Sequence, residues 1–306
     1  MVKFIREYQQ RILLISILCC FGSLGLVWHY GLNLGLEFTG GVEVELSTKE
    51  PASVEQMNTA LNQTQGTITS FGSSTDFLIK FHKHEDLDET VVKEQFIQVL
   101  TEHGIQAEIT RIDIVGSEFS EGMLDQAITA LFVAFLSITC YIAIRFEIRL
   151  AISAILALLF DPIIILGAFA YFRWTFDAPT LAGLLAVIGY SINDTIVVFD
   201  RVRENFQRSE NADSETLFFD SIEQTLGRTI ITSMLTFMVV LALLIFGTEV
   251  LRGFSLALAI GIVVGTFSSI IVAGPIALRL GVKREHLFPP EEPEVMSDNI
   301  DVEKHF

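Results

Sequence analysis

Long apolar runs alternate with one polar segment along this chain. The runs cover residues 12–30, 123–144, 151–172, 178–199, 229–246 and 254–278. A helix rises about 1.5 Å per residue, so about 20 apolar residues cross the roughly 30 Å of hydrocarbon in a bilayer. The pattern therefore predicts a polytopic α-helical membrane protein with six transmembrane helices.

The polar segment at residues 31–122 has a different periodicity. Alternating apolar positions at 42–46, 67–71, 77–81 and 107–115 predict strands, and 53–62 and 89–102 predict helices, with Ser53 as an N-cap. The order βαββαβ is typical of a ferredoxin-like domain. We therefore expect four parts: residues 1–30 with the first span, a small α+β ferredoxin-like domain at 31–122, a five-helix bundle at 123–280, and a tail at 281–306.

Composition supports a membrane protein and excludes several other classes. The chain is 51% hydrophobic and 19% charged, which is too apolar for an ordinary soluble domain. The net charge of -17 comes from acidic residues concentrated in 37–121 and after 285, so the last stretch is expected to be disordered, and no basic patch favours nucleic acid. The cysteines Cys19, Cys20 and Cys140 all fall in predicted spans, without the spacing of a disulfide framework or a metal site.

The distribution of Lys and Arg predicts the orientation. The short loops on one side of the predicted topology carry only Arg173 and Arg252. The other side receives Lys3, Arg6, Arg11, Arg145, Arg149, Arg201, Arg203, Arg208, Arg228, Arg279, Lys283 and Arg284. Because basic residues concentrate on the cytoplasmic side, we expect both termini in the cytoplasm and the polar domain outside.

The fourth span carries the most informative polar residues. The stretch LAGLLAVIGYSINDTIVVFDRVREN, residues 181–205, places Asn193 and Asp194 within a membrane-length helix. An Asp at the centre of a transmembrane helix costs about 2.5 to 3.5 kcal/mol, so such a carboxylate is a functional candidate. Gly183, Val187 and Asp194 recur on one helical face, which predicts that the acid faces other helices.

Two further charged residues are candidates for a shared ion path. Asp161 lies midway along the third span before Pro162, and Arg228 enters the fifth span. We predict a contact between Asp194 and Arg228 across helices four and five. Two structural alternatives stay open: Arg228 extends to lipid headgroups, and Asp161 satisfies backbone groups freed by the proline.

Two other patterns predict packing. Residues 206–223 are polar with interspersed apolar positions, which favours an amphipathic segment on the cytoplasmic membrane surface. In the sixth span, Gly261 and Gly265 form a small-xxx-small pair that permits close helix contact, without saying with which helix.

Three motifs resemble a known family. They are GLNLGLEFTGG at residues 31–41, GYSINDTIVVFDRVREN at 189–205 and QTLGRTIITS at 224–233. In this order and at these topological positions the chain closely resembles the SecD/SecF family of protein-export membrane proteins, within the RND transporter superfamily. The resemblance covers essentially the whole chain.

The resemblance implies a function and partners. It implies an accessory subunit of the Sec preprotein translocase in the bacterial cytoplasmic (inner) membrane, which uses the proton motive force to promote protein export. The implied partners are SecD, the SecYEG translocon, YajC, YidC, preprotein substrates and membrane lipid. The proton-path residues of the family fall on Asp194 and Arg228, to which the pattern of this chain adds Asp161 and Asn193 as candidates.

The motif after the first span is a second candidate site. It contains Glu37, Thr39, Gly40 and Gly41, and the family usually has Asp where this chain has Glu37. The charge is kept on a longer side chain, which favours an electrostatic role over short-range capping. The two glycines also suit a sharp exit from the membrane into the domain.

Other functions fit the sequence less well. Half of a proton-coupled RND-type small-molecule exporter is the main alternative, and a scaffold without ion coupling gives no reason for the polar cluster around Asp194. No P-loop, HExxH or GxSxG motif occurs, so we expect neither an enzyme nor a cofactor. His82 and His84 alternate along a strand, where a solvated edge is a better interpretation than a metal site.

Overall fold

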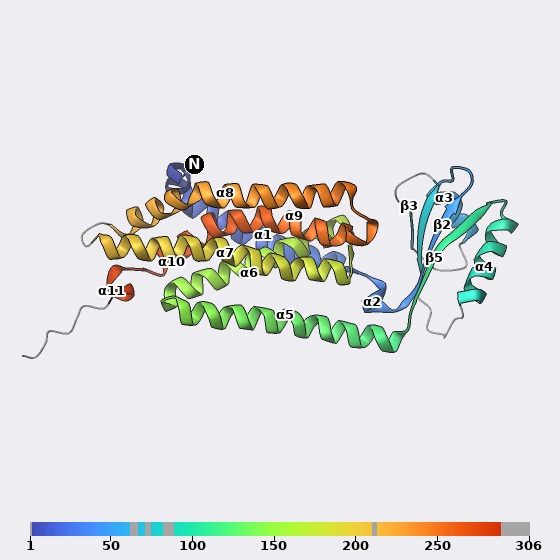
Figure 1. Cartoon of the computed structure of the whole chain (residues 1–306), viewed down its shortest axis with the longest axis horizontal. Coiled ribbons are helices and arrows are strands. Elements are labelled where there is room, and N and C mark those ends of the chain that lie inside the picture. The colour runs from blue at the N-terminus through green and yellow to red at the C-terminus, as the bar shows by residue number, and fades with distance from the viewer. Residues whose placement is uncertain (1, 62–66, 71–74, 82–88, 210–212, 289–306) are drawn as a thin grey trace, which may run out of the picture.

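A computed structural model describes residues 2–61, 67–70, 75–81, 89–209 and 213–288. A bundle of long helices occupies one end of the elongated molecule and a small sheet domain the other (Figure 1). The N-terminus and the last described helix, α11 (Arg284–Leu287), lie at the end of the bundle away from this domain. The predicted disordered tail from residue 289 onward, and the positions His82 and His84, lie outside the described residues.

Within the described ranges, six helical segments are long and apolar enough to cross a membrane, as the sequence predicted. The sixth segment begins with a short 3-10 turn, η1 (Glu249–Leu251), and contains a π-helical stretch, η2 (Ser268–Val272). The segments are α1 (Val2–Tyr30), α5 (Ser117–Arg145), α6 (Ile148–Phe172), α7 (Ala178–Arg208), α8 (Ser214–Phe246), and α9 (Arg252–Phe267) continuing through η2 into α10 (Ala273–Arg279).

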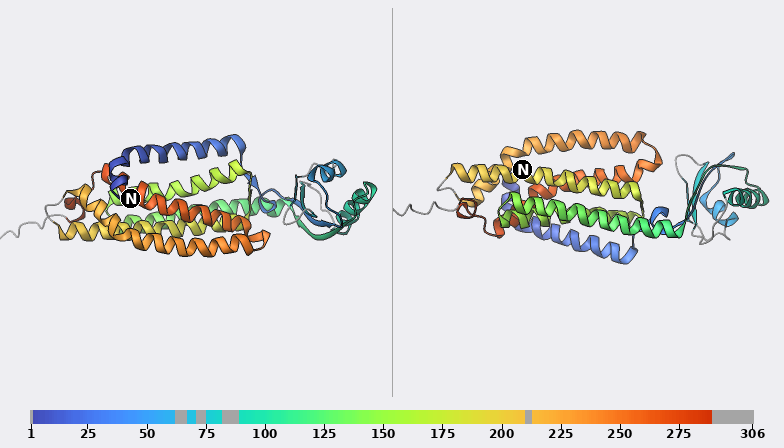
Figure 2. Two further views of the ribbon diagram at one scale, coloured as in Figure 1. Left: turned by 90° about the horizontal axis from the view of Figure 1, so that it is seen from above. Right: turned by 60° about the horizontal axis from the view of Figure 1, so that its bottom comes forward.

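The interior of the bundle is built from α6, α7 and α9. The buried share of the apolar stretch is 50% in α6, 50% in α7 and 56% in the α9 segment, but only 6% in α1, 11% in α5 and 17% in α8. Along most of their length, α1 and α8 lie on opposite sides of the bundle (Figure 2). The outer helices therefore offer most of their surface to lipid or to partner proteins.

The sheet domain has the predicted order of elements. It runs β2 (Gly41–Thr48), α3 (Val54–Ala60), β3 (Thr67–Ser70), β4 (Asp76–Phe81), α4 (Glu89–Glu102) and β5 (Ala107–Val115). The strands pair in the order β3-β4-β2-β5, and all neighbours are antiparallel. Val44, Phe77 and Leu100 belong to its buried core. The assignment to the ferredoxin-like class stays a prediction.

The segment at residues 206–223 differs from its prediction. It is not a separate helix, because α7 continues to Arg208 and α8 begins at Ser214 with Asp213 as its N-cap. Phe218 is fully buried and meets Phe199 edge-on at 6.1 Å between ring centroids. The predicted amphipathic pattern is present, since Asp220 and Glu223 are exposed while Leu217, Phe218 and Ile222 are buried, but the apolar face packs inside the chain against α7.

The entry into the sheet domain is tied to the bundle. The short strand β1 (Asn33–Leu34) pairs in parallel with β6 (Thr175–Phe176), which connects α6 to α7. Helix α2 (Leu36–Thr39) follows, and Gly40 and Gly41 then adopt φ values of 67° and 130°. Such positive φ angles favour glycine, so the two glycines make the turn that leads into β2.

Candidate functional site

Asp194 lies in a cluster of hydroxyl groups inside the bundle. Its side chain is 4% exposed, and Ser233 of α8 donates a hydrogen bond of 3.4 Å to its Oδ2. Thr266 Oγ1 of α9 lies 2.7 Å from Ser233 Oγ, and the Tyr190 hydroxyl of α7 lies 3.5 Å from it. Three helices therefore meet at Asp194 through groups that can exchange protons.

The predicted direct contact between Asp194 and Arg228 is not observed. Arg228 is exposed, and no ion pair within 4.0 Å includes it among the residues that the structure describes. Helix geometry explains this: at 3.6 residues per turn Arg228 points about 140° away from Ser233, which faces Asp194. The guanidinium charge acts on Asp194 only at longer range.

Asp161 occupies a second polar site against the inner face of α7. It is fully buried, and Ser191 of α7 donates a hydrogen bond to its Oδ2. The hydroxyl of Ser268, in η2, also interacts with this carboxyl group. A Cβ built on Gly265 would lie only 3.4 Å from Asp161 Oδ2, so the glycine lets α9 approach closely.

One helix connects the two carboxyl groups. Ser191 and Asp194 are three positions apart on α7 and are both buried, so they lie on neighbouring parts of the inner face. Asn193 is exposed and joins neither site in the described structure. The arrangement places Asp161 and Asp194 in the core and leaves Asn193 and Arg228 on the surface of the chain.

The motif between α1 and the sheet domain lies against the beginning of α7. Gly35 N donates to Phe176 O at 2.8 Å, and Thr39 Oγ1 donates to Gly35 O at 3.2 Å. Partial burial raises the pKa of Glu37 above its ordinary value of 4.5; the bond from its own backbone amide opposes this, and the nearby charge of Asp177 adds to it. The motif is therefore an electrostatic contact at the N-terminus of α7.

Asp177 is a functional candidate that the sequence analysis missed. Its Oδ1 accepts from Thr180 N at 2.8 Å and from the Thr180 hydroxyl at 2.5 Å, so it caps the N-terminus of α7. The signal was present: an Asp just before Ala178 and Pro179 is a typical helix start. Ser268 was also not paired with Asp161, because sequence alone does not locate a π-helical stretch.

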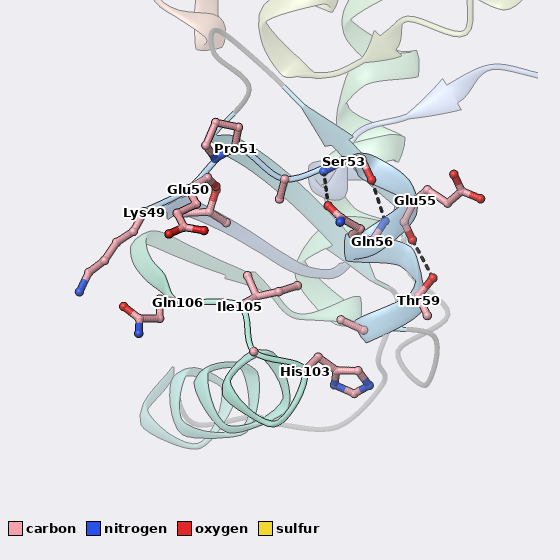
Figure 3. Close-up of a pocket in the computed structure, with 14 residues that line it drawn as sticks. Lys49, Glu50, Pro51, Ser53, Glu55, Gln56, Thr59, His103, Ile105 and Gln106 are labelled. Carbon is pink, nitrogen blue, oxygen red and sulfur yellow. Dashed lines mark hydrogen bonds between the residues drawn. The ribbon is translucent and has the colours of Figure 1, made fainter.

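A polar cleft of about 950 Å³ lies far from these groups, in the sheet domain (Figure 3). Its walls come from the end of β2, from α3 and from the turn after α4, including Lys49, Glu55 and His103. These three side chains are exposed, so the cleft adds no buried ionisable group. Within the described ranges, no three His, Cys, Asp or Glu side chains converge as a metal-binding group.

Comparisons with known proteins agree with one another. The family described as "Protein export membrane protein SecD/SecF, C-terminal" matches residues 95–283, and the "SecD/SecF GG Motif" matches residues 25–52. The chain is 40% identical to a protein translocase subunit SecF of Vibrio alginolyticus, over 85% of this chain and 84% of that protein. It is 41% identical to the same subunit of Escherichia coli O157:H7, over 89% and 86% of the two chains.

A solved structure shows the same architecture. The crystal structure of SecDF from Thermus thermophilus superposes with a TM-score of 0.81 at 32% identity, over 90% of this chain. The match spans 38% of that longer chain. With six apolar helices, two matching family motifs and SecF relatives that are aligned over most of their length, the chain belongs to the SecD/SecF family of bacterial multi-pass membrane proteins, among its SecF members.

Proposed function

We propose that this chain is an accessory subunit of the Sec preprotein translocase, acts with SecD, and uses the proton motive force to promote protein export. The observation that carries the proposal is the buried Asp194 among hydroxyl groups of three helices. Its helix, α7, follows strand β6, which pairs with the strand β1 that leads into the sheet domain. The names of the SecF relatives and of the SecDF structures support the assignment.

The SecDF structure, of which this chain matches 38%, carries SecD in its name, and this supports SecD as the partner. SecYEG, YajC, YidC and preproteins complete the proposed set of partners, with lipid around the outer helices. The sheet domain would face the periplasm and both ends of the chain the cytoplasm, because the basic residues collect at the end of the bundle away from the domain. No catalytic chemistry and no cofactor are part of the proposal.

The coupling step is a charge change at Asp194. Moving one charge across 100 mV is worth about 2.3 kcal/mol, so a few protons per cycle supply enough free energy to move a small domain. A proton that enters or leaves Asp194 changes the hydrogen bond from Ser233 and with it the contact between α7 and α8.

The fold offers a route from this charge change to the periplasm. Helix α7 begins at the β1–β6 pair and at the cap residue Asp177, next to Glu37. Any shift of α7 therefore reaches the segment from which the sheet domain emerges. A domain that moves in this way would pull on an emerging preprotein.

The test is release of a secreted protein from spheroplasts that contain the SecD partner, with and without an uncoupler. Asp194→Asn is expected to abolish the uncoupler-sensitive part of release at a normal protein level. Asp125→Asn is the matched control, because Asp125 is exposed on α5, and it should release like the native chain. An unchanged uncoupler response in Asp194→Asn refutes proton coupling at this residue; normal release combined with lost resistance to a toxic small molecule supports the exporter alternative.

A further inference from the structure

One oxygen of Asp161 receives no hydrogen bond from the residues that the structure describes. The residue is fully buried midway along α6, and its Oδ1 makes no hydrogen bond, whereas Oδ2 accepts from Ser191. Buried polar groups in proteins are almost always hydrogen-bonded, so a buried oxygen that accepts no hydrogen bond suggests that a proton or an ion is bound there. The site is separate from Asp194, whose contacts are on α8 and α9.

No neighbouring charge neutralises Asp161 in the described structure. From α1 the nearby titratable group is the Cys20 thiol, and α7 contributes the hydroxyl of Ser191, with Asp194 three residues further on. From α9 and η2 come Gly265 and the Ser268 hydroxyl, neither of which is charged. An ionised carboxylate in this setting would be an unpaired buried charge, which costs many times more than a neutral carboxyl group.

We infer that Asp161 is a second proton-binding group of this subunit and that the packing of α6, α7 and η2 seen here is its proton-loaded state, with the proton on Oδ1. The inference deepens the proposed function, on which it rests. Ser191 donates to Oδ2, which is the carbonyl oxygen of the protonated group. The Ser268 hydroxyl donates to Gly265 O at 3.2 Å, so its oxygen is free to accept from Asp161.

The geometry favours a proton over a metal ion. Hard cations need several oxygen ligands around them. The hydroxyl of Ser191 is directed at Oδ2, so among the described contacts Ser268 is the one hydroxyl left for Oδ1, and one oxygen does not make a cation site. Close contact with Gly265 leaves little space on the Oδ2 side, since even an added Cβ would be 3.4 Å from that oxygen.

Release of this proton would require the helices to separate. An ionised Asp161 must reach water, and it is enclosed by α6, α7 and the π-helical stretch of the sixth segment. A π-helical stretch is a common place for a helix to change its register, and Pro162 removes one backbone hydrogen bond of α6 beside the carboxyl group. Loading and unloading of Asp161 would thus switch the contact between α6 and α9.

Infrared spectroscopy of the chain with SecD in lipid tests the inference. At neutral pH the native complex is expected to show a protonated carboxyl C=O band that shifts in D₂O and is lost in Asp161→Asn. Asn is nearly isosteric and still accepts from Ser191. Ser191→Ala keeps the acid but removes the donor, so it should move this band instead of abolishing it, and it serves as the second variant if Asp161→Asn does not accumulate.

The outcomes are separable from those for the proposed function. If neither variant changes the band, Asp161 is ionised and the inference is wrong, whatever Asp194→Asn does to export. If replacing choline by Na⁺ at constant pH removes the band, the occupant is a sodium ion and the proton assignment is also wrong. If the band behaves as expected but export is insensitive to uncoupler, the proton site stands and the proposed function fails.

Discussion

Gly261 of α9 lies directly against the side chain of Val187 in α7, so closely that a Cβ on the glycine would overlap the valine. Gly265, one turn on, meets Ser191 in the same way, at 3.0 Å between the added Cβ and the serine Cβ. The small-xxx-small pair therefore packs against the helix that carries both Ser191 and Asp194. This contact fixes the distance between α7 and α9, and with it the geometry of both carboxyl sites.

Replacing Gly261 by Ala or Leu is expected to destabilise the chain and to separate α7 from α9. Overpacking of a close contact typically costs about 1 to 3 kcal/mol, and Leu should cost more than Ala. The loss of stability is measured by heating the purified chain and recording the fraction that stays monodisperse at each temperature. Gly25→Ala is the control, because nothing lies within 4 Å of a Cβ there and the position is exposed on α1. Equal stability of Gly261→Leu and Gly25→Ala would contradict the packing argument.

The sequence predicted the elements better than their contacts. Apolar length located six spans, and period-two alternation located the strands of the domain, because both signals are local. The pairing of β1 with β6 was not predictable, since two-residue strands carry no periodicity. The helix that packs against Gly261 was not predictable either, because a GxxxG pattern indicates close packing but not with which helix.

The candidate site was predicted by residue type and only partly by geometry. The cost of a carboxylate in hydrocarbon singled out Asp194 and Asp161, and both are buried. Charge alone suggested Arg228 as the partner of Asp194, but the angular position of Arg228 on α8 turns it outward, and Ser233 takes its place. Asn193 was grouped with its neighbour by sequence, although consecutive helical residues point about 100° apart.

Substitutions of Arg228 distinguish a long-range electrostatic effect on Asp194 from a direct contact with it. Because no ion pair joins it to Asp194, its positive charge should matter more than its guanidinium geometry. Arg228→Lys is therefore expected to keep most of the uncoupler-sensitive release, and Arg228→Gln to lose it. The spheroplast assay measures both at matched protein level. A Lys variant as inactive as the Gln variant would indicate that another state of the cycle contains a direct, bidentate pair.

The N-cap of α7 offers a stability test near the motif. Asp177→Ala removes the acceptor for Thr180 N, so it is expected to cost about 0.5 to 2 kcal/mol, whereas Asp177→Asn keeps an acceptor and should cost much less. Thermal unfolding of the two variants compares them directly. Equal losses in both would show that the negative charge, and not the cap, stabilises this end of the helix.

The raised pKa of Glu37 predicts how pH affects the docking of the motif at residues 31–41, that is, its packing against β6 and the start of α7. Burial raises the pKa of its carboxyl group above 4.5, and the charge of Asp177 adds to the shift. A raised carboxyl pKa means that the docked state binds the proton more tightly than an undocked chain. Docking is therefore strongest when Glu37 is protonated and weakens as the pH rises through its raised pKa.

Hydrogen exchange of the Gly35 amide, which bonds to Phe176 O, reports this docking. After correction for the intrinsic pH dependence of exchange, its protection is expected to increase as the pH falls from about 7 to about 5. Glu37→Gln should give high protection with little pH dependence, because it is neutral at every pH, and Asp177→Asn should shift the transition to lower pH by removing one negative charge. If protection in the native chain falls on acidification, the ionised form of Glu37 holds the motif in place. The charge of Glu37 would then stabilise the contact at the start of α7 instead of weakening it.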